Sequence, residues 1–227
     1  KLKILKQNLN IQKYIMINKN LGFAKACNYL LKNVTSNYCL LTQADIIIKL
    51  KSIKELLKSI NKVDNCIISA PNLSKSNKSS KVKVVDNVIG ANFLFDVNKM
   101  KKFKFFDEQF FLYWEDILLI DKVNKSNYKM IVANNIKAIH DSGSSTSNNV
   151  SIKFIRDSNF KYGELLYDYK LFKLRKLKII RQLFQNIFFF TFRLFLFRKK
   201  EYLHNLANIY GILKFLMFLF RKIFFFN

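Results

Sequence analysis

Two adjacent acids, Glu115 and Asp116, lie in an aromatic-rich segment, F-F-D-E-Q-F-F-L-Y-W-E-D-I-L-L-I-D-K-V. Apolar surroundings raise the pKa of a carboxylate toward values at which it can act as a general base. The same pattern is typical of a buried core in which the two acids form the polar first turn of a helix. Taken alone, the segment favours this structural interpretation, so a catalytic role depends on the residues around it.

Two further residues are candidate metal ligands. Asp45 ends an apolar strand in L-L-T-Q-A-D-I-I-I, and a carboxylate at the carboxyl end of a strand can hold a hard divalent cation beside phosphate. It is equally suited to cap the following turn. His140 follows the strand-like run M-I-V-A-N-N-I-K-A-I, where a lone histidine is more often a hydrogen-bonded structural residue than a ligand.

A glycine provides a candidate anion-binding position. In N-L-G-F-A-K-A-C-N, Gly22 stands between a short apolar run and an expected helical segment, 24–33. Without a Cβ atom, the backbone there can approach a ligand closely and present N–H groups to an anion. An ordinary helix-entry turn uses the same residue, and this stretch alone favours the turn.

Strand-like and helix-like segments alternate through the first 145 residues and predict how these side chains are positioned. The short apolar runs Y-I-M-I-N, Y-C-L-L-T, C-I-I-S-A and V-K-V-V are expected strands. Ser52 and Glu55 form a capping box, and the apolar residues Ile53, Leu56, Leu57 and Ile60 recur on one face, so a helix is expected over about 52–61. Strands spaced by short helices indicate an α/β layer with a mostly parallel sheet, which binds ligands beyond the carboxyl ends of its strands.

The composition changes near residue 150, after the polar stretch D-S-G-S-S-T-S-N-N. Most of the 24 phenylalanines follow it, in apolar runs flanked by Lys and Arg. No uninterrupted run reaches the ~18 residues of a clear membrane span, because Arg193 divides the longest one. Residues 146–227 are therefore expected to be a linker and amphipathic helices that lie on an anionic membrane surface. The alternative is a helical pair that packs on the first domain.

The net charge of +25 points to a polyanionic partner, either nucleic acid or an anionic membrane. An AT-rich genome, which over-produces Lys, Asn, Ile and Phe, explains part of this charge equally well. A nucleic-acid-binding module would interleave basic and aromatic residues across the first domain and leave the two adjacent acids without a role, so no nucleic acid partner is expected. The three cysteines, Cys27, Cys39 and Cys66, lack metal-type spacing and are interpreted as small buried residues in a reducing compartment.

Five blocks occur in an informative order: N-K-N-L-G-F-A-K-A-C-N, L-L-T-Q-A-D, V-I-G-A-N-F-L-F, F-D-E-Q-F-F-L-Y-W-E-D and I-H-D-S-G-S-S. Together they resemble family 2 glycosyltransferases, particularly the rhamnosyltransferase-like branch, over about residues 15–145. The resemblance implies a GT-A fold in residues 1–145, a nucleotide-sugar donor, Mg²⁺ or Mn²⁺, and inverting transfer to the hydroxyl of a glycan or lipid-linked glycan. It further implies bacterial surface polysaccharide or lipopolysaccharide synthesis at the cytoplasmic face of the inner membrane.

The resemblance also implies roles for the residues near the acids and the metal. Asp116 looks like the base that deprotonates the acceptor, Glu115 would orient the acceptor or the base, and Trp114 would offer a face for sugar stacking. Asp45 looks like the retained acid of a D-x-D-like metal motif, and His140 looks like its distant partner. A leaving diphosphate needs a metal to neutralise its charge, and the acceptor proton needs a separate base, so one site requires both kinds of acid.

The donor side is assigned by the same resemblance. It makes Asn20, Gly22 and Asn28 part of the donor-binding loop and helix. Gly90 and Ala91 match small residues that leave room for the donor sugar.

Several positions depart from the family pattern. The metal motif contains one acid, in Gln43-Ala44-Asp45, and Leu118 and Lys122 stand where the family often has a further acid and an arginine. The family's first strand, with its base-facing acid, should precede Y-I-M-I-N and is not found. We therefore expect an N-terminally incomplete domain, and the alternative is a degenerate, non-catalytic homologue that acts as a membrane-bound scaffold.

Overall fold

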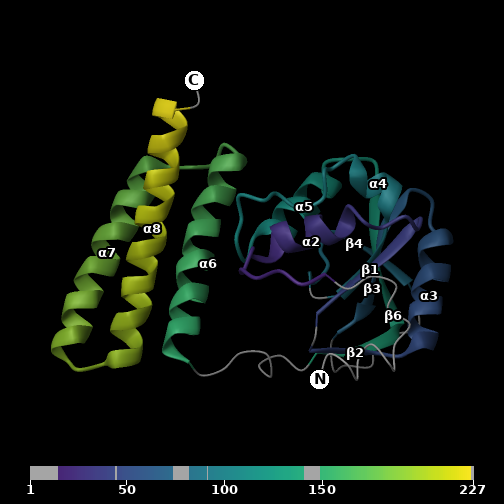
Figure 1. Ribbon diagram of the computed structural model, residues 1–227, viewed down its shortest axis with the longest axis horizontal. Coiled ribbons are helices and arrows are strands. Elements are labelled where there is room, and N and C mark those ends of the chain that lie inside the picture. The colour runs from purple at the N-terminus through teal and green to yellow at the C-terminus, as the bar shows by residue number, and fades with distance from the viewer. Residues whose placement is uncertain (1–14, 44, 74–81, 91, 141–148, 226–227) are drawn as a thin grey trace.

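The residues that the structure describes form a mixed six-stranded sheet covered by helices on both faces, followed by three long helices that lie side by side (Figure 1). The computed structural model describes residues 15–43, 45–73, 82–90, 92–140 and 149–225. Its strands are β1 (Tyr38–Thr42), β2 (Ile46–Ile48), β3 (Cys66–Asn72), β4 (Val82–Val85), β5 (Asn92–Asp96) and β6 (Lys129–His140). Its helices are α2 (Phe23–Leu31), α3 (Leu50–Asn61), α4 (Val97–Lys101), α5 (Glu115–Asn124), α6 (Val150–Lys170), α7 (Lys176–Phe195) and α8 (Lys199–Phe225).

The strand order is β1-β5-β3-β6-β2, and β4 also pairs with β6. Among the described strands only β3 and β6 pair in parallel, so the expected mostly parallel sheet is not confirmed. The physical reason is that β5 enters between β1 and β3 in the opposite direction, while β2 and β4 pair antiparallel with β6. Strands β1, β3 and β6 nevertheless run in one direction, so their carboxyl ends meet at one edge of the sheet.

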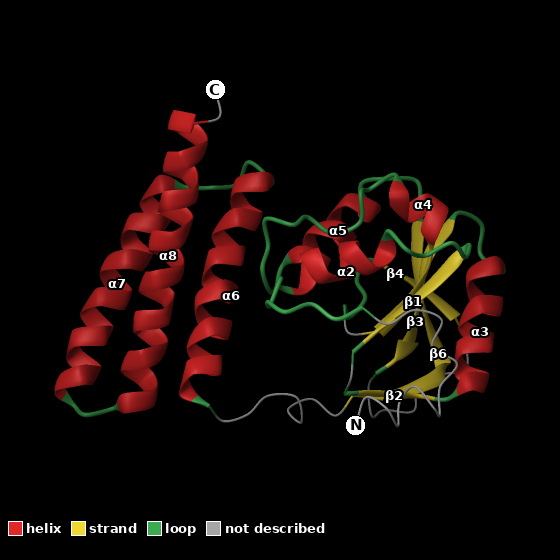
Figure 2. Cartoon of the chain, viewed as in Figure 1, coloured by secondary structure: helices red, strands yellow, loops and turns green. Residues whose placement is uncertain are grey.

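The sheet is covered on both faces by apolar side chains. Helix α3 packs its Leu56 and Ile60 on one face, and α2, α4 and α5 cover the other face (Figure 2). Strand β3 is buried along its whole length, which is typical of a central strand between two helical layers. The core therefore holds β3 firmly and leaves its carboxyl end at the edge where a ligand can approach.

Helix α3 ends at Asn61 as expected but begins two residues earlier than the capping box predicted. Its N-cap is Lys49, which makes no side-chain capping hydrogen bond. Ser52 consequently lies inside the first turn, and Glu55 forms an ion pair with Lys58 at 2.9 Å instead. The hydrophobic pattern located the helix correctly, but the capping interaction inferred from the sequence does not form.

The three cysteines behave as small apolar residues. All are free thiols, and Cys27 and Cys66 are buried. Burial raises the pKa of Cys27 to about 12 and that of Cys66 to about 11, so both thiols stay protonated at neutral pH.

Helix α6 joins the C-terminal helices to the first part of the chain. The side chain of Asn149 caps α6 by accepting a hydrogen bond from the Ser151 N–H at 2.8 Å. Residues of α6, α7 and α8 share one apolar cluster with two residues from the segment around α5, and this cluster consists of Phe110, Leu118, Tyr162, Leu165, Leu166, Ile179, Ile212 and Phe215. The expected polar linker lies mostly outside the described residues, and the boundary at 145/146 stays a prediction.

Candidate active site

The carboxyl edge of β1, β3 and β6 brings the two predicted metal ligands to one corner. Asp45 lies in the turn after β1, and the next residue, Ile46, pairs across the sheet with His140 at the end of β6. The backbone positions of Asp45 and His140 are therefore neighbours although they are far apart in the sequence. The side chain of His140 lies outside the described part of the chain. Among the described side chains, no group of three or more His, Cys, Asp and Glu is placed to hold a metal ion.

Asp116 lies in the first turn of α5, with its carboxylate against Gly90. The Ile117 N–H donates to Asp116 Oδ1 at 2.9 Å, and the Gly90 N–H donates to the same carboxylate. A Cβ atom on Gly90 would lie 2.8 Å from Asp116 Cγ, so a larger residue there would displace the acid from this position. Burial raises the pKa of Asp116 in spite of these donors. Asp116, predicted to be the base, thus contacts Gly90, which was predicted to leave room for the donor sugar.

Glu115 lies in a different environment from its neighbour. The residue is only 5% exposed, and its Oε2 atom has no hydrogen-bond partner among the described residues. Burial, together with the nearby charge of Asp116, raises the pKa of Glu115 to about 7, although the Tyr113 N–H donates to the carboxylate. Its charge in turn raises the pKa of Cys27 on α2. The two adjacent acids are therefore not equivalent, since Glu115 is enclosed in the core and Asp116 contacts the sheet edge.

A strained turn directs both acids. Tyr113 and Trp114 have φ angles of 69° and 74°, in the left-handed region that aromatic residues rarely adopt. The Trp114 ring packs against Phe160 and Tyr167 of α6, with ring centroids 5.4 and 5.2 Å apart. Arg156 of α6 donates to the Tyr113 hydroxyl at 2.8 Å. Helix α6 thus holds the turn from which α5 begins.

The packing of Trp114 bears on its predicted role. Its indole lies against α6, where a Cβ atom on Gly163 would come within 2.7 Å of Trp114 Cδ1. The indole Nε1 is buried and has no hydrogen-bond partner among the described residues. These contacts are those of a packed core residue, so stacking on an acceptor sugar stays a prediction that the packing does not support.

The predicted donor loop makes close contacts with the segment before α5. Gly22 has φ 79° and ψ 169°, a conformation essentially restricted to glycine, and a Cβ atom there would clash with the Phe111 carbonyl. The Phe23 N–H donates to that carbonyl at 2.7 Å, and Asn20 Oδ1 accepts from the Gly22 N–H at 2.9 Å. The interpretation of Gly22 as a turn residue therefore has a direct structural basis.

Asn28 links the same two segments from within α2. Its Nδ2 donates to the Phe106 carbonyl at 2.8 Å, and its Oδ1 accepts from the Phe106 N–H at 3.2 Å. Both ends of the amide are thus used within the protein. Donor binding by Asn20, Gly22 and Asn28 stays a prediction, and Ala91 lies outside the described residues.

The comparison with known families decides the assignment. The model described as Glycosyl transferase family 2 matches residues 2–120. This chain belongs to family 2 of the glycosyltransferases. A search of curated proteins found no significant match. Family membership brings a GT-A, Rossmann-like α/β fold, glycosyltransferase activity, a nucleotide-sugar donor and a glycan acceptor.

The match to this glycosyltransferase family covers Asp45, Gly90 and both acids, whereas His140 and the three long helices lie beyond it. The sequence reasoning therefore identified the family correctly. It did not predict that α6, which lies outside the match, holds the turn at Tyr113 and Trp114. Two aromatic residues directly before the acids were the available signal, but their left-handed conformation cannot be inferred from residue type.

Asn92 is a second residue of this glycosyltransferase that sequence reasoning missed. It is fully buried, and neither atom of its amide group has a hydrogen-bond partner among the described residues. It lines a cavity of about 220 Å³ at the carboxyl end of β3, together with Ala70, Pro71, Asn72, Leu73, Asn87, Val88, Ile89 and Val132. A polar residue at the start of the otherwise apolar strand N-F-L-F was the only signal in the sequence.

The raised pKa of Glu115 predicts a specific pH dependence of stability. The pKa rises from the ordinary value of 4.5 to about 7, so the folded chain keeps a proton that the unfolded chain loses between these pH values. Stability from this group is complete below pH 4.5 and is lost as the pH rises through about 7. The loss amounts to roughly 3 kcal/mol. In Glu115→Gln, the free energy of unfolding measured with urea should not show this decrease between pH 4.5 and about 7.

Asp64→Asn provides the control, because Asp64 is an exposed carboxylate after α3. This variant should follow the pH dependence of the unsubstituted chain. An unchanged slope in Glu115→Gln would show that Glu115 does not titrate in the folded state as its burial requires.

Proposed function

We propose that this glycosyltransferase is an inverting enzyme that transfers a sugar to the hydroxyl of a glycan or lipid-linked glycan, with Asp116 as the base. The observation that carries the proposal is the contact of Asp116 with Gly90 at the edge of the sheet. Two residues further on, Asn92 pairs with Thr42, which ends the strand leading to Asp45. The proposed base and the proposed metal ligand thus belong to the same edge.

The proposed reaction is a single displacement. The acceptor oxygen forms a bond to the anomeric carbon as the bond from that carbon to the diphosphate oxygen breaks, and the diphosphate leaves with the electron pair. Asp116 takes the acceptor proton. The burial that raises its pKa makes the carboxylate a stronger base than an exposed aspartate, while the two N–H donors fix its direction.

Enzymes of this family commonly use a divalent metal, and the residues at the corner of β2 and β6 suit one. Asp45 offers carboxylate oxygens, which Mg²⁺ and Mn²⁺ prefer, and the pairing of Ile46 with His140 places the histidine position beside it. A metal held there would neutralise charge on the leaving diphosphate. Two protein ligands leave positions for phosphate oxygens and water, so the small number of acidic residues is compatible with such a site.

Replacing the base should separate chemistry from binding. Asp116→Asn should lower the transfer rate by on the order of 10²–10⁴-fold, because the amide cannot take the acceptor proton. Donor and metal affinity should stay nearly unchanged, since the base contacts only the acceptor. Turnover assays and calorimetric donor titration measure the two effects.

Glu115→Gln and Asp64→Asn serve as comparisons for this experiment. The first should lower kcat less than Asp116→Asn does, because Glu115 is enclosed in the core and would act by orienting the base. The second should leave kcat and the acceptor KM unchanged. Near-normal turnover in Asp116→Asn with no turnover in Glu115→Gln would reverse the two roles. Activity in both would reject the catalytic assignment, and inactivity of the unsubstituted chain with every nucleotide sugar would favour the scaffold alternative.

The proposed metal ligand makes a separate prediction. Asp45→Ala should abolish the increase in donor affinity that Mn²⁺ or Mg²⁺ provides, because the carboxylate that would hold the cation is gone. Calorimetric titration with and without metal measures this increase, and unfolding in urea confirms that the fold is retained. Asp64→Ala, at an exposed carboxylate after α3, is the control. Unchanged metal dependence in Asp45→Ala would reject the assignment.

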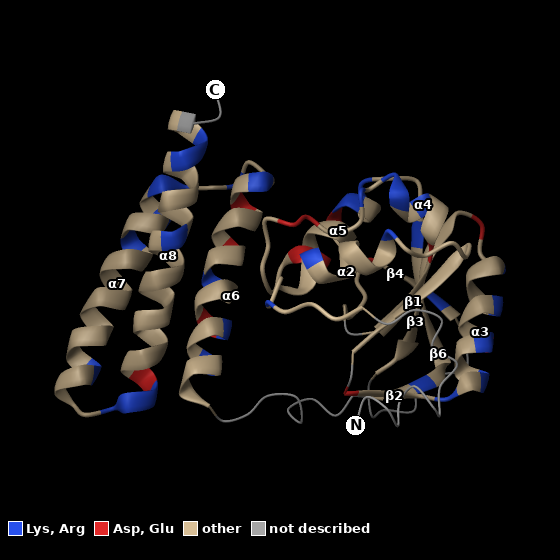
Figure 3. Ribbon diagram, viewed as in Figure 1, with Lys and Arg blue, Asp and Glu red and all other residues tan. Residues whose placement is uncertain are grey.

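We also propose that α7 and α8 bind an anionic membrane surface, on the cytoplasmic face if the enzyme is bacterial. Their outer surface is largely apolar, and its exposed side chains include Phe184, Phe188, Phe192, Phe195, Leu213, Met217 and Phe220. Phe197, in the turn between the two helices, is exposed as well. Lys and Arg on these two helices lie mainly toward the ends of the helical pair (Figure 3). This distribution suits helices that bury phenylalanine among lipid chains and direct cations to headgroups.

The inner contacts of the pair support the same proposal. Asn186 Oδ1 accepts hydrogen bonds from the side-chain amides of Asn205 and Asn208 at 3.0 and 3.1 Å. Arg193 donates to Asn205 Oδ1 at 2.7 Å and lies 3.2 Å from a carboxylate oxygen of Glu201. Polar groups thus pair with one another between the helices while phenylalanines point outward, which is the arrangement expected where lipid replaces water. By length and composition α8 is also apolar enough to cross a bilayer, although core helices of soluble proteins pass the same test.

Polar substitutions on this surface should weaken membrane binding. Phe195→Ser and Phe197→Ser should each reduce partition into phospholipid vesicles by on the order of tenfold, because each removes one exposed phenylalanine from contact with lipid. Sedimentation with vesicles measures the partition. Ile47→Ser and Leu50→Ser, at exposed apolar positions beside the sheet, should have no effect. Equal losses at both pairs of positions would show that this surface of the bundle is not the membrane contact.

A further inference from the structure

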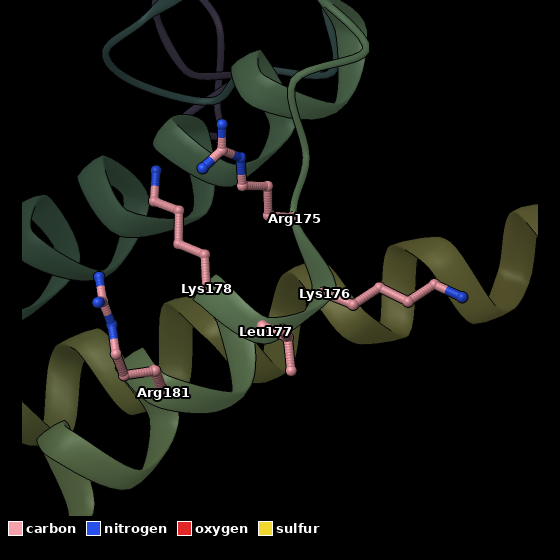
Figure 4. A pocket seen from close by; sticks show the side chains of 5 residues that line it. All are labelled: Arg175, Lys176, Leu177, Lys178 and Arg181. Atoms are coloured by element: carbon pink, nitrogen blue, oxygen red, sulfur yellow. The ribbon is translucent and has the colours of Figure 1, made fainter.

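The start of α7 forms a cavity of about 480 Å³ that is rich in positive charge. It is lined by Arg175, Lys176, Leu177, Lys178 and Arg181 (Figure 4). Arg175, Lys178 and Arg181 recur every three residues and point to the same side of the helix, whereas Lys176 points away along α8. The cavity therefore presents three cations to one region of space.

The pairing of these cations is unequal. Lys178 forms ion pairs with Asp168 at 2.7 Å and with Glu164 at 3.2 Å, so its charge is already balanced by α6. Arg175 and Arg181 make no ion pair or side-chain hydrogen bond with any described residue. Two guanidinium groups are thus left available on either side of a lysine that is held in place. A guanidinium binds a phosphate through two parallel N–H donors, so this pair suits a phosphate group.

The backbone adds to the attraction for an anion. The N-cap of α7 is Arg175, which makes no side-chain capping hydrogen bond. The N–H groups of Lys176 and Leu177 have no acceptor within the helix and point toward its N-terminal end, where the helix dipole is positive, whereas the Lys178 N–H donates to the Arg175 carbonyl at 3.0 Å. A phosphate beside Arg175 would meet these groups as well as the side chains.

An apolar stripe lies on an adjacent face of α7, and its first side chain, Leu177, points away from the three cations (Figure 4). Leu177, Ile180 and Phe184 follow helical spacing on the outer surface and are 81%, 51% and 69% exposed. The stripe continues into the apolar surface that the proposed function assigns to the membrane. Arg221 and Lys222, near the end of α8, lie at the same end of the bundle, and Lys222 donates to the Tyr169 hydroxyl of α6 at 3.0 Å.

We propose that this cavity binds the phosphate of an anionic lipid, whose hydrocarbon chain lies along Leu177, Ile180 and Phe184. The combination of unpaired guanidinium groups and an adjoining apolar stripe matches an amphiphile better than a soluble phosphate. The inference rests on the membrane association in the proposed function and adds a defined headgroup site to it. Arg175 and Arg181 hold the phosphate, and Lys178 fixes α7 to α6.

The test compares two variants of the full chain that lose the same charge. Arg175→Gln/Arg181→Gln removes the two available cations, and Lys199→Gln/Lys200→Gln removes two exposed cations at the opposite end of the bundle. Each is sedimented with phosphatidylcholine vesicles and with vesicles that also contain phosphatidylglycerol. In the arginine variant, the ratio of binding to anionic over neutral vesicles should fall at least about tenfold. The lysine variant should retain most of it, and binding to neutral vesicles should be similar in both.

Three outcomes would overturn the proposal. Equal losses in the two variants would show a diffuse attraction to negative charge without a site. No preference of the unsubstituted chain for anionic vesicles would exclude headgroup recognition. Calorimetric binding of inorganic phosphate to the unsubstituted chain without vesicles, absent in the arginine variant, would show that the cavity takes a soluble phosphate. Circular dichroism should confirm that the arginine variant folds, because neither arginine pairs with a described residue.

Donor binding separates this proposal from the proposed function. Arg175→Gln/Arg181→Gln should bind the nucleotide sugar as tightly as the unsubstituted chain, because the substitutions lie on α7 and not at the sheet edge. If the unsubstituted chain transfers no sugar and the arginine variant still loses its preference for anionic vesicles, the lipid site stands and the enzymatic proposal fails. If transfer occurs and the vesicle preference is unaffected, only the lipid site is rejected.

Discussion

The packing of Trp114 against α6 is the interaction on which the candidate site depends. Two consecutive aromatic residues in the left-handed region cost on the order of 1–3 kcal/mol each, and such a turn persists only where its surroundings enforce it. The contacts of Trp114 with Phe160 and Tyr167, and the hydrogen bond from Arg156 to Tyr113, provide that enforcement. Because α5 begins directly after this turn, the same contacts place one acid against the sheet edge and enclose the other in the core. The C-terminal helices thus help to shape a site that the family match alone would place wholly in the first 120 residues.

Much of the fold could be predicted from the sequence, but the direction of the strands could not. Local patterns located β3 and α3 because a buried apolar run and a helical stripe are properties of neighbouring residues. The insertion of β5 between β1 and β3 depends on pairings between distant segments, which no local pattern contains. The capping box failed for a related reason: α3 begins earlier, and Glu55 pairs with Lys58 instead.

The residues of the candidate site could be proposed from the sequence, whereas their contacts could not. Resemblance to the family selected Asp45, His140, Gly90 and Asp116, and the structure brings these positions to one edge of the sheet in two adjoining pairs. The resemblance could not show that Asn28 binds the backbone of Phe106, since this partner lies about 80 residues away in the chain. Nor could it show that Asn92 would be a buried amide without a hydrogen-bond partner among the described residues, because burial of a polar side chain follows from tertiary packing.

The close approach of Gly163 to Trp114 makes α6 and the beginning of α5 a single cooperative unit. A fluctuation that lifts α6 away removes the contacts that hold the left-handed turn, and the two strained residues then relax toward ordinary backbone angles. In such an event Asp116 would lose the turn that orients it while the sheet stays folded. The orientation of Asp116, the proposed base, would then depend on the free energy of local opening at α6 more than on the global stability of the domain.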